Sequence, residues 1–251
     1  MKIDLTGKAA VIVGGSGGLG EAMAHTLSGA GAKIALVGRN QVKLDKVAGE
    51  LKAKGAVVET FTADMVSESD VAKLAKDVNA KFKNPQILIN SAGINIRKSV
   101  TDFTLEEFQS VVDSSLVTTF LACNAFVPGM KGTGYGRIIN LASMMAHISL
   151  PNRTAYSGGK AGLLGFTKSL ALELASEGIT ANTISPGPFL TEMNLPVVND
   201  PEANKLFLSK LPVGRWGKVE EIGGLVCYLC SDLAGFITGT DIIIDGGWTA
   251  A

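Results

Sequence analysis

Three polar side chains in the second half of the chain have types and a spacing that suit proton transfer. Ser143 stands thirteen residues before Tyr156, and Lys160 follows Tyr156 by four. A step of four residues places Tyr156 and Lys160 on one face of a helix. Tyrosine titrates near ~10, but an adjacent ammonium favours the phenolate, so Tyr156 can exchange a proton with an alcohol. The Tyr-x-x-x-Lys spacing is common on helices, so its weight depends on the surrounding elements.

Those elements alternate regularly along the chain. Short, uniformly apolar runs predict strands at 9–13, 33–37, 57–61, 87–89, 137–141, 180–184 and 241–244. Amphipathic stretches predict helices near 40–53, 67–82, 104–128, 155–176 and 219–230. This alternation predicts an α/β fold, a Rossmann-like doubly wound parallel sheet of about seven strands within one domain, residues 1–251. Ligands of such sheets bind beyond the carboxyl ends of the strands, where Ser143 would lie.

A glycine-rich turn joins the first predicted strand to a helical pattern, and a second strand follows. This βαβ context turns a glycine motif into a credible dinucleotide site, although glycines also mark ordinary βα turns. Glycine lets phosphate approach the backbone closely, and the N–H groups at a helix start carry partial positive charge. The candidate cofactor-binding residues here are Gly14, Ser16, Gly17, Gly18, Leu19 and Gly20.

The residues after the second and third strands suggest which nucleotide binds. Gly38 stands where an acidic residue would accept a ribose 2′-OH, and Arg39 and Asn40 follow it. A guanidinium can pair with a 2′-phosphate through two parallel bonds, which favours NADP(H) over NAD(H). The alternative is a solvated Arg39 at a helix start. Asp64, next to Met65, can accept from an adenine amino group or cap the following helix.

Composition excludes some classes of partner. Twenty-three basic and twenty-three acidic side chains balance, which argues against a nucleic acid or an acidic membrane as partner. No apolar run approaches the ~20 residues that span a bilayer, so we expect a cytoplasmic protein. Cys227 and Cys230 lie in an apolar helical stretch without a nearby histidine, so we expect buried thiols and no metal site.

Taken together, these motifs occur in order at the ends of successive strands. They are Gly14-x-x-x-Gly18-x-Gly20, Asn90-Ser91-Ala92-Gly93, the Ser143, Tyr156 and Lys160 set, and Pro186-Gly187 followed by Thr191. Over almost its whole length the chain resembles the short-chain dehydrogenase/reductase family. The resemblance implies hydride transfer between a nicotinamide and a carbonyl or alcohol carbon. It implies Tyr156 as acid/base, Ser143 as donor to the substrate oxygen and Lys160 as support for both.

The resemblance also assigns further contacts to the cofactor. Asn90, Ala92 and Gly93 would line its adenine-ribose side, Lys160 and Tyr156 the nicotinamide ribose, and Pro186, Gly187 and Thr191 the carboxamide. It implies a homo-oligomer, commonly a tetramer.

Ser115 departs from the family, which usually has an asparagine there to hold a water that relays protons to the active-site lysine. A serine hydroxyl is shorter, so the relay would need an extra water, a shifted carbonyl or help from Ser114. This departure keeps open an alternative function, that of a cofactor-binding regulatory or scaffolding protein with little turnover.

The sequence supports two interpretations of the substrate. Candidate contacts beside Ser143 and Tyr156 are Asn95, Arg97 and Met145. The run Ala92 to Lys98 is similar to sugar-acid dehydrogenases such as gluconate 5-dehydrogenase, where a cation would suit a carboxylate. Much of the chain is equally similar to 3-oxoacyl-carrier-protein reductases. His147 would be a polar substrate contact or a plain loop histidine.

Overall fold

The computed structural model describes residues 3–250, and over that range seven strands form one parallel sheet in the order β3-β2-β1-β4-β5-β6-β7. The strands are β1 (Ala9–Val13), β2 (Lys33–Gly38), β3 (Val58–Thr62), β4 (Ile87–Asn90), β5 (Gly136–Leu141), β6 (Ile179–Pro186) and β7 (Asp241–Ile244). The helices are α1 (Gly18–Gly29), α2 (Gln41–Ala53), α3 (Glu68–Phe82), α4 (Leu105–Val112), α5 (Thr118–Met130), α6 (Thr154–Leu174), α7 (Leu195–Val198), α8 (Pro201–Leu208) and α9 (Val219–Leu229). The predicted doubly wound parallel sheet is confirmed.

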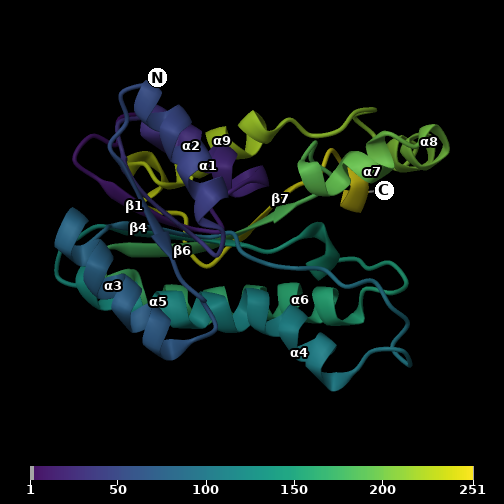
Figure 1. Ribbon diagram of the computed structural model, residues 1–251, viewed down its shortest axis with the longest axis horizontal. Helices are drawn as coiled ribbons and strands as arrows, with labels where there is room; N and C mark the ends of the chain where they lie inside the picture. Colours follow the sequence, from purple (N-terminus) through teal and green to yellow (C-terminus); the bar gives the residue numbers. More distant parts are fainter. Residues whose placement is uncertain (1–2, 251) are drawn as a thin grey trace.

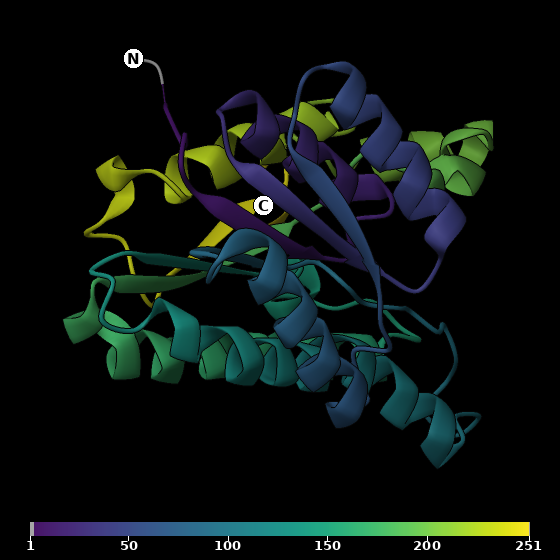
Figure 2. The same ribbon diagram turned by 60° about the vertical axis from the view of Figure 1, so that its left-hand side comes forward.

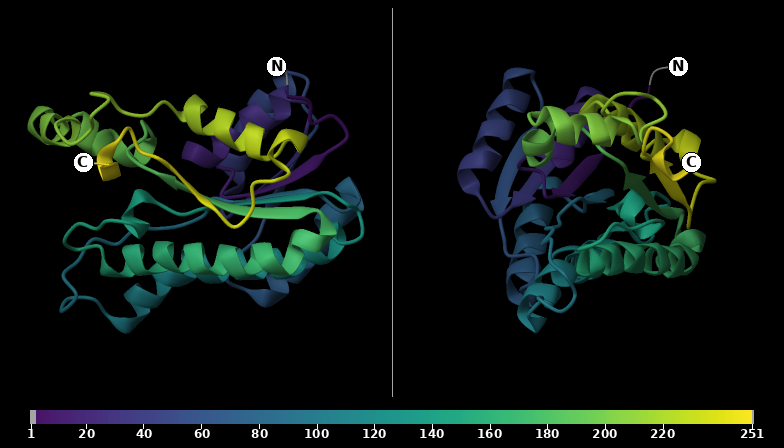
Figure 3. Two further views of the ribbon diagram at one scale, coloured as in Figure 1. Left: turned by 180° about the vertical axis from the view of Figure 1, so that it is seen from behind. Right: turned by 90° about the vertical axis from the view of Figure 1, so that its right-hand side faces the viewer.

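Helices cover both faces of the sheet. In Figure 1, α1, α2 and α9 lie on one side and α3, α4, α5 and α6 on the other, and Figure 3 shows α9 and α6 on opposite faces from behind. Figure 2 shows the N-terminal strands, purple to blue, between these two layers. Strand β1 explains the arrangement: Ala10 and Ile12 pack into one apolar cluster, and Val11 and Val13 into the other. Since successive side chains point to opposite faces, a wholly apolar strand requires cover on both.

The glycine-rich turn is shaped by two close approaches. Gly14 has a φ of +84°, and a Cβ there would lie 2.8 Å from the Ala92 backbone nitrogen. A Cβ on Gly20 would lie 2.1 Å from the Gly14 carbonyl oxygen. Only glycine fits both positions, so β1, the turn and the start of α1 are drawn tightly against the end of β4.

Capping side chains fix the starts of three helices. Asn40 Oδ1 accepts from the Lys43 N–H at 3.0 Å, and Ser67 Oγ accepts from the Asp70 N–H at 3.3 Å. Thr104 and Glu107 form a capping box at the start of α4. Because Ser67 caps α3, the alternative capping role for Asp64 is wrong.

The helix predicted near 104–128 is present, and a π-helical turn interrupts its regular α-helical geometry. A five-residue π-helical turn, Asp113–Val117, joins α4 and α5 into a continuous helix, Leu105–Met130. By length and composition alone, this helix contains an 18-residue apolar window that could cross a membrane, although no uninterrupted apolar run marks it. Half of the apolar window is buried, and α5 packs against β4 and α3. Here the segment is a core helix of the α/β fold.

The helices α7 and α8 stand apart from the sheet, within the segment 188–211, whose length suits a movable lid (Figure 1). An aromatic cluster holds α8: Phe207 stacks on Trp216 with ring centroids 5.3 Å apart and meets the edge of Trp248 at 5.3 Å. Trp248 also packs with Met144, Met145 and Leu211. The C-terminal segment therefore packs between the lid and the loop after β5.

Candidate active site

The predicted site residues gather beyond the carboxyl ends of β1, β4, β5 and β6. The strand order reverses between β1 and β4, since the chain passes from β1 to β2 and β3 on one side and continues with β4 to β7 on the other. Ligands of open α/β sheets bind at such a reversal. The sequence motifs therefore meet where the fold favours a ligand.

Ser143 begins a short 3₁₀ turn, Met144–Ala146, directly after β5. Its side chain is buried, and its Oγ accepts from the Met145 N–H at 3.1 Å. That bond leaves the hydroxyl proton of Ser143 available to a neighbouring oxygen. Tyr156 is such a neighbour, because the Ser143 hydroxyl acts to lower the pKa of the phenol.

Tyr156 and Lys160 lie one turn apart on α6, with the Lys160 Nζ 5.8 Å from the centre of the Tyr156 ring. Burial raises the pKa of Tyr156, while Ser143 and the Arg153 guanidinium oppose that rise. In the protein without a cofactor, burial therefore outweighs the neighbours that favour the phenolate, and Lys160 is not among those neighbours. The Lys160 Nζ points to the Leu141 carbonyl oxygen, to which it donates at 2.5 Å.

Lys160 is the buried cation of the site, with 5% of its surface exposed. Burial lowers the pKa of its amine from 10.5 to about 8. A lysine that titrates near neutral pH can exchange its proton with its surroundings. Its neighbours include Gly93, where a Cβ would lie 3.4 Å from Nζ.

Ser115, the substituted relay position, lies in the π-helical turn and is buried. A Cβ on Gly159 of α6 would lie 3.0 Å from the Ser115 Oγ, which places the hydroxyl beside the residue preceding Lys160. The Ser115 hydroxyl donates to the Val112 carbonyl oxygen at a long 3.3 Å. The Ser114 hydroxyl donates to Val111 O at 2.8 Å and accepts from the Ile94 N–H at 3.0 Å, which leaves it one acceptor lone pair and no donor for a relay water.

The cofactor candidates line a continuous path from β1 to β6. A Cβ on Gly18 would lie 3.8 Å from Thr191 Cγ2, so the glycine turn and Thr191 face each other. A Cβ on Gly17 would meet nothing within 4 Å, so space for a phosphate lies beside the start of α1. The side chain of Leu19 is half-buried against the core. This open cradle fits a dinucleotide.

A cavity of about 690 Å³ opens beyond the ends of β1 and β2. Its lining consists of Ser16, Arg39, Asn40, Gln41 and Val42, none of which is acidic. Arg39 and Asp64 are both exposed. The cavity thus offers a guanidinium, a hydroxyl and amide groups to a nucleotide.

Three predicted cofactor contacts point elsewhere. The buried Asn90 side chain donates to Asn140 Oδ1 at 2.8 Å, and Met65 packs in the core under α3. Both side chains face inward, so only their backbone can touch a cofactor. The Gly187 N–H donates to Ile244 O at 2.9 Å, which removes it as a donor to the carboxamide. Each of these three residues is bonded or packed within the fold, and the spacing of residues in the sequence does not reveal such contacts.

The structure brings one of the predicted substrate residues, Met145, against Tyr156, and it adds Arg153, which acts electrostatically on Tyr156. Met145 is buried in the cluster that Tyr156 contacts, and Asn95 has a buried Oδ1 without a hydrogen-bond partner among the described residues. Arg153, which the sequence analysis missed, precedes α6 and makes no capping bond with its side chain. Arg153 stands three residues before Tyr156, a spacing that places two side chains on the same face of a helix. This spacing could have indicated from the sequence that Arg153 lies near Tyr156.

Arg97 and Arg153 form a pair of like charges at this site. Burial lowers the pKa of the Arg153 guanidinium, and the neighbouring Arg97 charge lowers it further. Within residues 3–250, neither guanidinium has an ion-pair partner. Two unpaired guanidiniums next to a candidate acid/base residue make a site for an anion.

Known proteins are similar to this chain over almost its whole length. A family model described as Enoyl-(Acyl carrier protein) reductase matches residues 14–249, almost the entire chain. The D-beta-hydroxybutyrate dehydrogenase of Rhizobium meliloti is 36% identical over 97% of this chain and 99% of its own. The chain belongs to the short-chain dehydrogenase/reductase family.

Other members of the short-chain dehydrogenase/reductase family are similar to the same degree. The 3-oxoacyl-[acyl-carrier-protein] reductase FabG of Aquifex aeolicus is 33% identical over 98% of this chain and 99% of its own. A structure provisionally described as an NAD(P)-dependent gluconate 5-dehydrogenase from Beutenbergia cavernae, with bound NADP at low occupancy, is 30% identical. It aligns over 100% of both chains with a TM-score of 0.94. Membership makes this chain an NAD(P)-dependent oxidoreductase acting on hydroxyl or carbonyl groups and does not favour the regulatory alternative.

Proposed function

We propose that this protein is an NADP(H)-dependent dehydrogenase/reductase of a small substrate that carries a carboxylate. The observation that carries the cofactor choice is the cavity at the end of β2, where Arg39 and Ser16 line the wall and no lining residue is acidic. A guanidinium beside a hydroxyl suits a 2′-phosphate, and a carboxylate that would repel it is missing from the lining.

Replacing Arg39 with Ala tests the cofactor choice. We expect wild-type protein to bind NADPH more tightly than NADH, and Arg39→Ala to narrow that gap by ~1 to 3 kcal/mol, the range of a charged hydrogen bond. Isothermal titration calorimetry with NADPH and with NADH measures the difference between their binding free energies in each protein. Lys43→Ala is the matched control, because Lys43 lies near the cavity but pairs with Glu192 and does not line it. Equal affinities for the two nucleotides in both proteins would refute the proposal.

In the proposed reaction, Tyr156 gives a proton to the substrate oxygen during reduction and takes it back during oxidation. The bound nicotinamide supplies or accepts the hydride. Ser143 donates a hydrogen bond to the same oxygen, and burial of the Tyr156 phenol keeps its proton available for transfer. Lys160 would restore that proton indirectly, through a hydroxyl group or a water between the two side chains, because burial lowers the pKa of its amine to about 8.

The Arg97 and Arg153 pair favours an acid, such as a sugar acid or a hydroxy acid, as substrate. Arg153 acts electrostatically on Tyr156, so an anion bound to it would lie within reach of the acid/base residue. The names of two similar proteins, a hydroxybutyrate and a gluconate dehydrogenase, support this class. The second candidate is a 3-oxoacyl thioester, supported by the similarity to FabG.

Replacing Arg153 with Leu separates these candidates. We expect KM for an acid substrate to rise by about 10-fold to 100-fold, since a charge-assisted hydrogen bond contributes ~1.5 to 3 kcal/mol. The methyl ester of the same substrate, which has no charge to lose, should change little. Initial rates of NADPH oxidation over a panel of keto acids, their esters and acetoacetyl thioesters measure both. A panel in which only thioesters are reduced, and Arg153→Leu changes nothing, would favour the second candidate.

Assembly and location complete the proposal. We propose a cytoplasmic homotetramer, as the family resemblance implies. Exposed apolar side chains on α4, α5 and α6 support a buried face there: Leu105 is 71% exposed, Phe120 50% and Leu172 84%. These helices form one outer layer of the molecule (Figure 3).

A further inference from the structure

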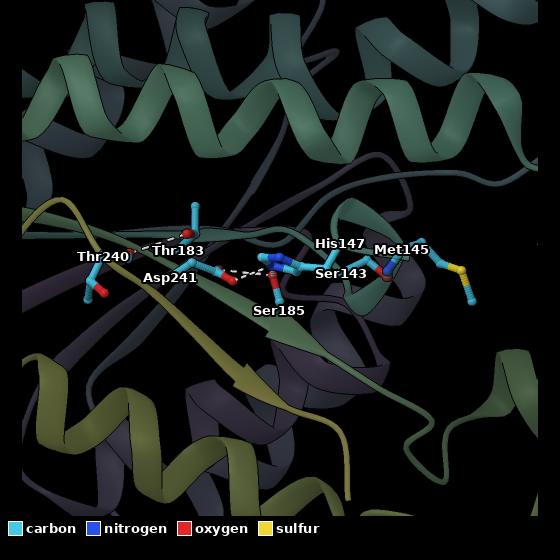
Figure 4. A network of polar contacts seen from close by, with 7 residues as sticks. All are labelled: Ser143, Met145, His147, Thr183, Ser185, Thr240 and Asp241. Carbon is cyan, nitrogen blue, oxygen red and sulfur yellow. Dashed lines mark hydrogen bonds and ion pairs between the residues drawn. The ribbon is translucent and has the colours of Figure 1, made fainter. Parts of the chain in front are cut away.

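A polar cluster links the loop that carries Ser143 to the edge of the sheet. His147 Nε2 lies 2.7 Å from Asp241 Oδ2, and the Ser185 hydroxyl donates to the other carboxylate oxygen at 2.9 Å (Figure 4). Ser185 Oγ also lies 3.4 Å from His147 Nε2. The three side chains come from the turn after β5, from β6 and from β7.

The turn between Ser143 and His147 is too short and too well bonded to move at one end alone. The Ala146 N–H donates to Ser143 O at 2.8 Å, and the His147 N–H donates to Met144 O at 3.0 Å. Met145 N–H binds the Ser143 hydroxyl itself. These bonds couple the position of the His147 ring to the position of Ser143.

Holding the sheet edge together does not require this cluster. Strand β7 pairs only with β6, and Asp241 is its first residue. The Thr183 N–H already donates to the Thr240 carbonyl oxygen at 2.9 Å, and the Thr183 hydroxyl reaches the same oxygen at 3.3 Å. Asp241 is nevertheless mostly buried, with 12% of its side chain exposed, which costs free energy unless partners compensate. His147 and Ser185 compensate both of its oxygens.

We propose that His147, Asp241 and Ser185 form a clamp that positions Ser143 against Tyr156, with His147 as a positioning residue that touches no substrate. The clamp acts through the hydrogen bonds that Asp241 accepts from His147 Nε2 and from the Ser185 hydroxyl. The other charged group facing it is Lys168 of α6, which lines a small cavity of about 220 Å³ together with His147 and Asp241. The proposal rests on the roles proposed above for Ser143 and Tyr156.

A measurement without substrate or cofactor tests the clamp. The chain contains three tyrosines, so selective ¹³C labelling of the tyrosine ring resolves Tyr156, assigned with Tyr156→Phe. Because the Ser143 hydroxyl lowers the pKa of Tyr156, His147→Ala should raise the pKa of Tyr156 above its wild-type value as Ser143 moves away. His147→Gln keeps a donor to Asp241 and should retain the wild-type titration. His25→Ala, at the chain's other histidine on α1, is the matched control.

Activity provides the second measurement, with NADPH and the best substrate from the panel. His147→Ala should lower kcat by about 10-fold to 100-fold, the effect of a small misplacement, with the Kd of NADPH unchanged. His147→Gln should restore most of kcat, and Asp241→Asn added to His147→Ala should cost little more. An unaltered Tyr156 titration in a folded His147→Ala protein, or a glutamine variant as impaired as the alanine variant, would overturn the clamp. If the panel yields no substrate, the proposed function fails while the titration still decides the clamp.

Discussion

Tyr156→Phe should lower turnover by ~10² or more while leaving the Kd of NADPH nearly unchanged. The phenol hydroxyl is the proton source in the chemical step, and general acid/base groups contribute about 10² to 10⁴ to the rate. The ring itself stays, so its packing against Met145 and the other members of that buried cluster is preserved. Steady-state kinetics and nucleotide titration measure the two effects separately.

Two further results would sharpen the assignment of Tyr156. Ser143→Ala should lower kcat as well, and the double variant should lose less than the product of the two single losses, because both groups act on one oxygen. A Tyr156→Phe protein with most of its activity would mean that another group supplies the proton. Arg153 cannot replace it, since a guanidinium stays protonated in proteins.

Lys160→Met should abolish most activity and yet stabilise the protein without cofactor. Burial lowers the pKa of Lys160 from 10.5 to about 8, which corresponds to ~3 kcal/mol of cost for holding the charge inside the fold. Methionine has a similar length and no charge to bury. We expect a gain in the free energy of unfolding of ~1 to 3 kcal/mol at pH 7, reduced by the loss of the bond to the Leu141 carbonyl.

The pH dependence gives this prediction a definite sign. Between pH 8 and pH 10.5 the unfolded wild-type chain binds more protons at Lys160 than the folded one, so wild-type stability rises with pH in that window. Below pH 8 both states are protonated and the full cost is present. The advantage of Lys160→Met should therefore be largest below pH 8 and shrink towards pH 10.5. Urea unfolding at several pH values measures it, and a variant less stable than wild type at pH 7 would show that the buried bond outweighs the burial cost.

The fold and the placement of Tyr156 beside Lys160 were predictable from the sequence because each leaves a local pattern. Strand β1 is uniformly apolar, which only a sheet covered on both faces explains. Gly14 and Gly20 mark close approaches of the backbone, and a four-residue spacing places Tyr156 and Lys160 on one helix face. Each of these inferences uses neighbours a few residues apart, for which period and chemistry are enough.

The features that could not be predicted from the sequence depend on contacts between segments that are distant along the chain. His147 and Asp241 are ninety-four residues apart, and nothing around either one predicts their contact. Asn90 looked like a groove residue because it ends a strand, but its side chain turns inward to Asn140. The π-helical turn at Ser115 joins two helices that the sequence presents as one pattern, and burial sets the pKa of Tyr156 against the expected direction. Side-chain direction and burial are tertiary properties, which spacing does not encode.

The aromatic cluster on α8 has a practical consequence for observing the enzyme. The chain contains two tryptophans, and both Trp216 and Trp248 contact Phe207 of α8. Trp216 also donates to Asn204 on the same helix at 2.8 Å. Any displacement of α8 must therefore change the surroundings of every indole in the chain. We therefore expect intrinsic fluorescence to report a displacement of α8, so stopped-flow mixing with nucleotide or substrate can test for such a movement without an added dye.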